Sequence, residues 1–218
     1  MDPQRTTSTP PLDREDIRRR LAAVCPPEAA DVPVAHPPEA GVPVLQGVPG
    51  VPAAVLVGLV GHDDGPTIIL TERTEHLSNH PGQISFPGGR VESTDAGPAD
   101  AALREAFEEI GLDPDKVELL GCLPLHMTIS SFSVYPFVGW IEPPLELTLD
   151  THEVAGVFEV PLAFVLDAKN HQLGSLVLGE VAHTFYVIEW QGHRIWGATA
   201  GMLVTLARAL ASRSLPGA

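Results

Sequence analysis

The sequence predicts an α/β (α+β) protein in which helices pack on a mixed β-sheet. Two observations carry this prediction: candidate strands outnumber candidate helices, and the two do not alternate regularly, as they would in a doubly wound parallel fold. The length and composition of the chain agree with this prediction. A chain of 218 residues, of which 44% are hydrophobic and 19% charged, can bury one ample core.

Proline sets the first 50 residues apart. Ten of the 22 prolines lie there, and proline fixes φ and donates no backbone hydrogen bond. We therefore expect residues 1–50 to form an extended arm strapped onto the domain, with one short helix at about residues 13–24. The rest is predicted to be one domain over residues 51–212, followed by a tail at residues 213–218.

From residue 52 onward the pattern indicates strands. The apolar run AAVLVGLV (residues 53–60), the turn HDDGP and the segment TIILTER predict two strands, the first buried on both faces. Further strand candidates are residues 117–125, 132–140, 153–160 and 184–190. An amphipathic helix is expected at residues 98–110, and a second, ATAGMLVTLARALA, near the C-terminus.

Charge and cysteine content exclude several classes of function. Thirteen Lys and Arg against 28 Asp and Glu give a net charge of −15, which argues against binding nucleic acid or an anionic membrane. No apolar run reaches the ~20 residues of a membrane helix, and the N-terminus has no signal-peptide pattern. Cys25 and Cys122 are too few for a disulfide framework, so we expect a cytoplasmic protein with an inert Cys122. A phosphate-ester substrate would need a bound divalent cation.

The predicted helix at residues 98–110 holds the main clue to function. Its apolar stripe consists of Ala99, Ala102, Leu103, Ala106, Phe107 and Ile110. On the opposite side, Glu105, Glu108 and Glu109 share one face and repel one another. Glu108 and Glu109 also lie in the last turn, where the helix dipole disfavours a negative charge by about 0.3–1 kcal/mol. Clustered carboxylates suit a hard cation such as Mg²⁺ or Mn²⁺.

A glutamate-rich helix face is usually only a solvated surface, so the surrounding sequence must distinguish this from a metal site. Just upstream lies GQISFPGGR, residues 82–90. Gly88 and Gly89 permit positive φ and a close approach of the backbone to a ligand or metal. Strand, Gly-Gly loop and acidic helix are therefore predicted to converge, as expected for cation-assisted attack on a phosphate.

The segment from Gly89 to Leu112 resembles the Nudix box, which is Gly, five residues, Glu, seven residues, and then Arg-Glu-apolar-any-Glu-Glu-any-Gly-apolar. Arg104, Glu105, Glu108 and Glu109 match its second half. Asp95 replaces the first Glu, and eight residues instead of seven precede Arg104. Both departures are similar to the coenzyme A pyrophosphatase branch of the Nudix family.

The flanking residues extend this resemblance over about residues 51–210. Residues 70–89 are similar to the second signature of that branch, which runs from Leu-Thr-x-Arg through His-x-Gly-Gln to Phe-Pro-Gly-Gly. Ser78 stands where several relatives have Arg, which puts in doubt any contact made by that Arg. Residues 153–163 and 196–203 also resemble the branch.

The resemblance implies a Nudix fold, with a mixed sheet sandwiched between helices, and a Nudix hydrolase. The implied reaction cleaves the diphosphate of coenzyme A or its derivatives, giving 4′-phosphopantetheine and adenosine 3′,5′-bisphosphate. The implied catalytic and Mg²⁺ or Mn²⁺-binding groups are Glu105, Glu109, Glu108 and the Gly89 carbonyl, with Arg104 orienting a carboxylate and Glu108 alternatively activating water. Substrate would contact Arg73, His80, Gln83, Gly88 and Arg90. A later loop would add Glu146, Asp150 or Glu153.

Other interpretations stay open. The substrate could be another nucleoside diphosphate, such as ADP-ribose or NADH, or the chain could be a non-catalytic nucleotide-binding Nudix module. The module is disfavoured because a binder has no need of a repulsive carboxylate cluster. His80 and Arg90 could be surface residues, and Phe132 and Trp196 are expected in the core. The expected partner is a small molecule, and a homodimer is left open.

Overall fold

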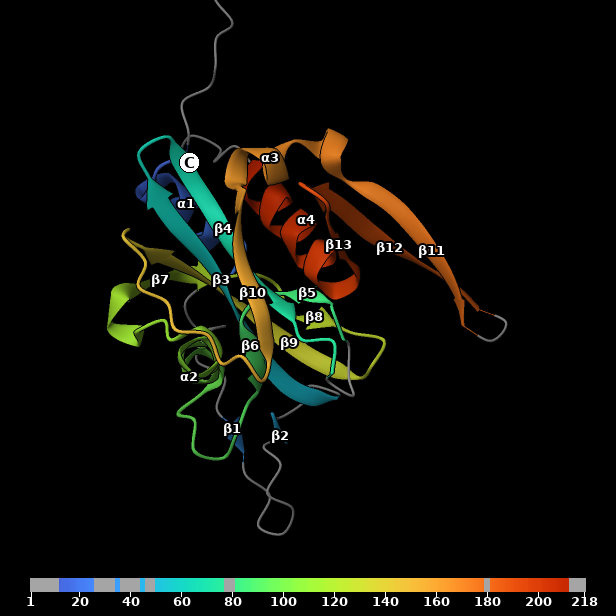
Figure 1. Ribbon diagram of the computed structural model, residues 1–218, viewed down its shortest axis with the longest axis horizontal. Helices are drawn as coiled ribbons and strands as arrows, with labels where there is room; N and C mark the ends of the chain where they lie inside the picture. The colour runs from blue at the N-terminus through green and yellow to red at the C-terminus, as the bar shows by residue number, and fades with distance from the viewer. Residues whose placement is uncertain are drawn as a thin grey trace, which may run out of the picture.

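Figure 1 shows the computed structural model, which describes residues 12–25, 34–35, 44–45, 50–76, 81–178 and 181–211. Its helices are α1 (Arg14–Ala22), α2 (Pro98–Ile110), α3 (Leu162–Leu166) and α4 (Gly197–Ala211), with 3₁₀ turns at Pro114–Lys116 and Ala168–Asn170. Its strands are β1 (Val34–Ala35), β2 (Val44–Leu45), β3 (Val51–His62), β4 (Gly65–Arg73), β5 (Ile84–Ser85), β6 (Gly88–Arg90), β7 (Val117–Cys122), β8 (His126–Met127), β9 (Phe132–Ile141), β10 (Val154–Pro161), β11 (Gln172–Leu178), β12 (Val181–Trp190) and β13 (His193–Trp196).

The central sheet is mixed, as predicted. Its main path runs β10-β4-β3-β9-β7, and the short strands β5, β6 and β8 pair with β4, β3 and β9, respectively. The long central strands β3 and β9 are parallel, whereas their other neighbours are antiparallel. β3 is buried along most of its length, which confirms that a continuous apolar run here marks a strand covered on both faces.

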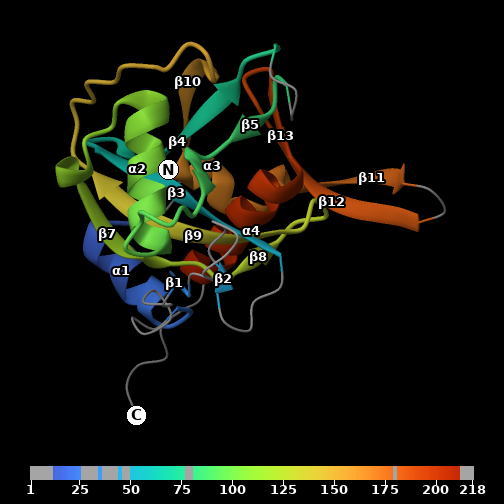
Figure 2. The same ribbon diagram turned by 90° about the horizontal axis from the view of Figure 1, so that it is seen from below.

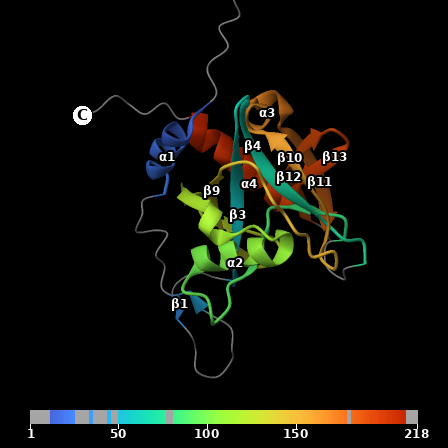
Figure 3. The same ribbon diagram turned by 60° about the vertical axis from the view of Figure 1, so that its left-hand side comes forward.

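Helices cover both faces of this sheet. Leu56 and Val60 of β3 pack in the cluster that contains the buried face of α2. Val57 and Leu59, on the other face, join the cluster formed with α1, α3 and α4. Figure 3 shows α2 lying apart from the α1 and α4 pair. The alternation of side chains along β3 thus builds the predicted sandwich.

Helix α2 has the predicted bounds, but its buried face differs from the predicted stripe. Gly111 ends the helix in the left-handed region at φ 69°, and its N–H donates to the Phe107 carbonyl at 2.8 Å. Phe107, expected in the stripe, is 54% exposed, whereas Ala101 and Glu109 are buried. The stripe prediction is therefore wrong at Phe107: the helix is rotated so that small alanines approach the sheet and Glu109 turns inward.

A second, three-stranded sheet has the antiparallel order β11-β12-β13. Of its strands, only β12 corresponds to a sequence prediction. Figure 2 shows β11 and β12 extending away from the rest of the molecule. In the part of the chain that the structure describes, no helix is long and apolar enough to cross a membrane.

Most of the proline-rich arm lies outside the described residues, as does the tail. Its predicted helix is α1, which begins after Asp13, whose side chain accepts a hydrogen bond from the Asp16 N–H at 2.7 Å. Ile17 and Leu21 are fully buried. Beyond α1, a disulfide joins Cys25 to Cys122 of β7, with 5.6 Å between their Cα atoms. The sequence analysis did not predict this pairing.

Candidate active site

The Gly-Gly loop brings backbone directly against α2. Gly88 has φ 156°, and a Cβ there would lie 2.7 Å from the Val55 Cα of the neighbouring strand. A Cβ on Gly89 would overlap the carboxylate of Glu105. Glycine is therefore required at residue 88 because of its φ and the close neighbouring strand. It is required at residue 89 because the Glu105 carboxylate leaves no room for a side chain. The predicted convergence of these glycines and the acidic helix is confirmed, but Gly88 and Gly89 belong to strand β6 and are not a free loop.

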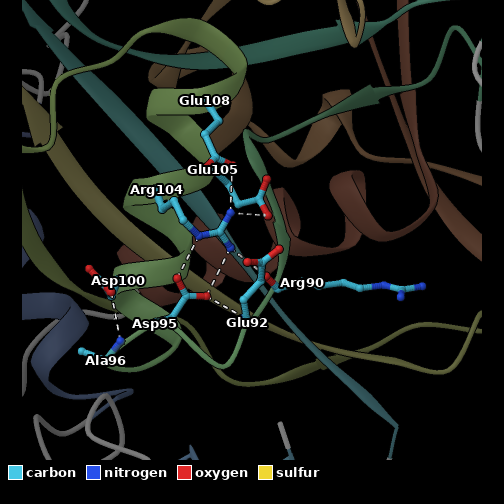
Figure 4. A network of polar contacts seen from close by, with 8 residues as sticks. All are labelled: Arg90, Glu92, Asp95, Ala96, Asp100, Arg104, Glu105 and Glu108. Atoms are coloured by element: carbon cyan, nitrogen blue, oxygen red, sulfur yellow. Dashed lines mark hydrogen bonds and ion pairs between the residues drawn. The ribbon is translucent and has the colours of Figure 1, made fainter. Parts of the chain in front are cut away.

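Arg104 organises the polar network drawn in Figure 4. Its Nε donates to Asp95 Oδ1 at 2.8 Å. Its Nη1 donates to Glu108 Oε2 at 2.9 Å and Glu105 Oε1 at 3.1 Å, and its Nη2 to the Arg90 carbonyl at 3.0 Å. The hydrogen bond to Asp95 raises the pKa of Arg104 above its ordinary value. Arg104 therefore ties the loop to the helix and orients carboxylates, as the resemblance implies.

Asp95 anchors the network from the loop. Its side chain is only 2% exposed, and one of its oxygens also accepts the Glu92 N–H at 2.6 Å. A buried carboxylate needs such partners, because an unpaired charge away from water is costly. Asp95 thus fills the position of the first Nudix-box glutamate by holding the arginine.

Glu105 and Glu109 form the acidic pair at the centre of the site. Glu109 is 5% exposed, and its Oε2 has no hydrogen-bond partner among the described residues. Burial, followed by the nearby Glu105 charge, raises the pKa of Glu109 to about 8, although Arg73 and the Gly88 N–H oppose this. Burial also raises the pKa of Glu105, against the effect of Arg104. The site therefore disfavours the ionised form of both carboxyls, because the positive groups nearby do not offset burial and mutual repulsion.

Glu108 does not join this pair. Its side chain is 56% exposed and bound to Arg104. No group of three metal-ligating side chains is preassembled within the described ranges. The predicted three-carboxylate face is therefore split: Glu109 turns toward the sheet, Glu105 lies against the loop, and Glu108 faces outward.

The late loop contributes one further carboxylate, Glu153. Thr148 and Asp150 donate backbone N–H groups to the carbonyls of Ile110 and Glu109, each at 2.9 Å, and so cap the end of α2. Glu153, further along this loop, raises the pKa values of both Glu105 and Glu109. Its Oε2 also lies 3.9 Å from Arg73 Nη2.

The other two late-loop candidates face elsewhere. Glu146 Oε2 lies 3.9 Å from Lys116 Nζ, and Asp150 Oδ1 accepts the His152 N–H at 2.9 Å. Of the three alternatives left open by the sequence, Glu153 is therefore the residue brought to the acidic pair. Its selection depends on the docking of the loop on α2, which no local sequence pattern reveals.

The predicted substrate-binding residues are divided between several places. Arg73, at the end of β4, lies at the acidic site. Gln83 accepts the Arg73 N–H through its backbone carbonyl at 3.0 Å. The side chain of Arg90 points away from the network (Figure 4) and lies over the ring of Phe132. His80 is outside the described residues.

Comparison with known proteins agrees with this geometry. The chain matches the NUDIX domain over residues 51–176. It is 41% identical over 155 residues to the uncharacterized Nudix hydrolase NudL of Enterobacter sp. (strain 638), which covers 71% of this chain and 80% of that protein. The same protein of Escherichia coli (strain K12) is 40% identical over 156 residues, with the same coverage.

Among solved structures, an Ap4A hydrolase binary complex from C. elegans is 21% identical, with a TM-score of 0.45. The match covers 51% of this chain and 80% of that one. The family match and the NudL identity place the chain among the Nudix hydrolases. The chain belongs to the Nudix family and is similar to NudL.

Proposed function

We propose that this Nudix hydrolase cleaves the diphosphate of coenzyme A or its derivatives with a divalent cation, Mg²⁺ or Mn²⁺. The products would be 4′-phosphopantetheine and adenosine 3′,5′-bisphosphate. The observation that carries the hydrolytic part is the acidic pair beside Gly89, in which Glu105 is partly buried and Glu109 is buried with an unpartnered oxygen. The choice of coenzyme A rests on the signature at residues 70–89.

The donor set fits a hard cation. Glu105 and Glu109 offer carboxylate oxygens, Gly89 offers a backbone carbonyl, and these are the ligands that Mg²⁺ and Mn²⁺ prefer. The unpartnered Glu109 oxygen and the raised pKa of this carboxyl support the proposal, because a bound cation would stabilise the ionised carboxylate. When bound, such a cation polarises a phosphoryl oxygen and lowers the pKa of its water.

The remaining residues of the site would orient its carboxylates and neutralise the charge of the substrate phosphates. Arg104 fixes Glu105 and Glu108 relative to the loop. Arg73, at the edge of the acidic pair, would bind a substrate phosphate, because a planar guanidinium makes paired hydrogen bonds to phosphate oxygens. Glu108, which is exposed and paired with Arg104, would take a proton from an attacking water or complete the cation site. Glu153 adds a carboxylate on the side of Arg73.

The test is a substrate panel with matched variants. The wild-type kcat/KM would be compared for coenzyme A, ADP-ribose, NADH and diadenosine polyphosphates at saturating Mg²⁺, with products identified. We expect coenzyme A or a thioester to be preferred, and Glu105→Gln and Glu109→Gln each to lower kcat at least about 100-fold. Glu146→Gln, the outward-facing carboxylate of the late loop, is the control.

The outcomes separate the alternatives. A higher kcat/KM on ADP-ribose or NADH would reassign the substrate and leave the acidic site in place. Near-normal kcat in both glutamine variants would remove the site assignment itself. Binding of nucleotide without turnover of any substrate would favour a non-catalytic module.

A further inference from the structure

Two basic side chains, Arg90 and His126, lie on the opposite face of the sheet from Glu105 and Glu109. Across the strands, Arg90 is opposite Ala53, Ala53 is opposite Val134, and Val134 is opposite His126. Directly opposed residues project to the same face of a sheet. Because Ala53 and Val134 pack in the cluster that includes α4, Arg90 and His126 also lie on the α4 side.

Arg90 is an exposed cation whose partner is aromatic. Its guanidinium carbon lies 5.5 Å from the centroid of the Phe132 ring. Most arginines in the described part of the chain pair with a carboxylate, namely Arg14, Arg18, Arg19, Arg73 and Arg104. No carboxylate of a described residue lies within ion-pair distance of Arg90. In a protein of net charge −15, its guanidinium edge remains open to an anion.

His126 supplies a second donor beside the same ring. Thr128 is opposite Phe132, since its N–H donates to the Phe132 carbonyl at 2.9 Å, so His126 is the diagonal neighbour of Phe132 across β8 and β9. Diagonal neighbours in an antiparallel pair lie roughly 7–8 Å apart. The imidazole is half-buried against α4, where a Cβ on Gly201 would lie 3.0 Å from its Cε1. Neither ring nitrogen has a hydrogen-bond partner among the residues that the structure describes.

We propose that Arg90, Phe132 and His126 form a subsite for a terminal phosphate monoester of the substrate, separate from the scissile diphosphate. This rests on the proposed function, and in coenzyme A the group is the 3′-phosphate. The guanidinium pairs with the phosphate oxygens, and the imidazole N–H donates to them. The Phe132 ring, 5.5 Å from the guanidinium carbon, helps to hold the Arg90 side chain at this position.

Strand β6 places this subsite within reach of the acidic pair. Gly89 contacts the Glu105 carboxylate on one face, and successive side chains of a strand project to opposite faces, so Arg90 is presented on the other. Among the described strands, β6 pairs only with β3. A nucleotide that wraps the outer edge of β6 would thus place two phosphate groups on opposite sides of one short strand.

The kinetic test compares coenzyme A with dephospho-coenzyme A. In the wild type, kcat/KM should be at least about tenfold higher for coenzyme A, the scale of one charge-assisted contact. Arg90→Ala should lower the ratio of the two values about tenfold, Arg90→Lys should restore part of it, and His126→Ala should lower it further in combination. Arg208→Ala is the matched control, because its guanidinium also lies over an aromatic ring, Tyr186, at 5.6 Å. An unchanged ratio in Arg90→Ala would overturn the proposal.

A binding test separates this proposal from the proposed function. Adenosine 3′,5′-bisphosphate and adenosine 5′-monophosphate would be titrated by calorimetry into the metal-free wild type and Arg90→Ala, with melting temperatures checked. We expect the wild type to bind the bisphosphate at least about tenfold more tightly, and Arg90→Ala to remove most of that difference. This result supports the subsite even if coenzyme A is not hydrolysed. Equal affinity for both nucleotides in the wild type would overturn the subsite even if coenzyme A is the substrate.

Discussion

The carboxylate of Glu105 occupies the space in which a side chain at Gly89 would begin. This contact makes the loop and the helix a single unit, since neither can be altered without displacing the other. We predict that Gly89→Ala lowers kcat at least about 100-fold, because the added methyl group displaces a charge-stabilising carboxylate.

Gly97→Ala is the control for Gly89→Ala. A Cβ at Gly97 would meet no heavy atom within 4 Å, so this variant should retain kcat within about twofold, as surface substitutions usually do. Steady-state kinetics on both variants decide the matter. Equal activity of the two would show that Glu105 need not occupy its position against the loop.

Burial of Glu109 predicts a pH-dependent stability of the metal-free protein. Burial raises the pKa of Glu109 from its ordinary value of 4.5 to about 8 in the folded protein, so folding favours the protonated form. This contribution is fully present below the unfolded pKa, is lost at up to about 1.4 kcal/mol per pH unit as the pH rises to the folded pKa of about 8, and is gone above it. The groups facing Glu109 are Glu105, Glu153, Arg73 and the Gly88 N–H.

Urea unfolding in EDTA at pH 6 and pH 9 measures this effect. The free energy of unfolding of the wild type should fall between these values relative to that of Glu109→Gln, which lacks the titrating group. At pH 9 the variant should therefore be the more stable protein. Parallel pH profiles for the two proteins would contradict the buried, unpaired state of Glu109.

Glu153 and Glu146 offer a matched test of the late loop. Glu153 acts on the pKa values of the acidic pair, whereas Glu146 lies beside Lys116. We predict that Glu153→Gln lowers kcat/KM about tenfold or more, whereas Glu146→Gln leaves it within about twofold. The kinetics of the two variants, measured at the same Mg²⁺ concentrations, provide the comparison. A larger loss in Glu146→Gln would mean that the loop docks differently.

Arg73→Ala should weaken the transition state by about 1.5–3 kcal/mol, or roughly ten- to a hundredfold in kcat/KM. Mn²⁺ affinity should change by less than about threefold, because hard cations do not bind guanidinium. Two effects on Mn²⁺ affinity oppose each other. Removal of the Arg73 charge reduces repulsion of the cation, but it also raises the pKa of Glu109, whose protonated form binds a cation poorly. Mn²⁺ titration and coenzyme A kinetics on the same variant test both parts, and unchanged kinetics would reduce Arg73 to a partner of Glu153.

The disulfide between Cys25 and Cys122 closes a long loop, with 97 residues of sequence separation. Its loss in Cys25→Ser or on reduction should cost about 2–5 kcal/mol in the free energy of unfolding, because the unfolded chain regains freedom. Urea unfolding with and without reductant measures this, and the double variant Cys25→Ser/Cys122→Ser should not respond to reductant. Two titratable thiols in protein purified without reductant would show that the bond does not form.

Sequence signals predicted the elements that are defined locally. Helix α2 has its predicted bounds because Pro98 and Gly111 mark its ends through φ alone. Strands β11 and β13 escaped detection because they lack a clear apolar run. The inward turn of Glu109 and the outward turn of Phe107 depend on which flank of the helix meets the sheet, and periodicity does not specify this for a helix rich in alanine.

The sequence predicted those parts of the site whose residues lie close together in the chain. Loop, arginine and glutamates lie within 25 residues of sequence, and the structure brings Glu105, Glu109 and Arg104 together around Gly89. The choice of Glu153, the cysteine pairing and the grouping of His126 with Arg90 each depend on segments far apart in the chain. Strand order and loop docking, which are tertiary properties, determine them.

The clamp around Asp95 has a consequence for the extra residue in this Nudix box. Asp95 accepts the Glu92 N–H through its side chain, and its own N–H donates to the Glu92 carbonyl at 3.2 Å. These two hydrogen bonds hold Asp95 in the position from which it binds Arg104. Two residues further on, Gly97 is fully extended, and a Cβ there would meet no heavy atom within 4 Å. The backbone on either side of this open position is bound to the helix, since the Ala96 N–H donates to Asp100 and the Gly97 carbonyl accepts the Ala101 N–H. We infer that the extra residue is accommodated at Ala96 and Gly97 without a change in the register of Arg104. The number of residues between Asp95 and the helix can thus change without moving the glutamates that follow Arg104.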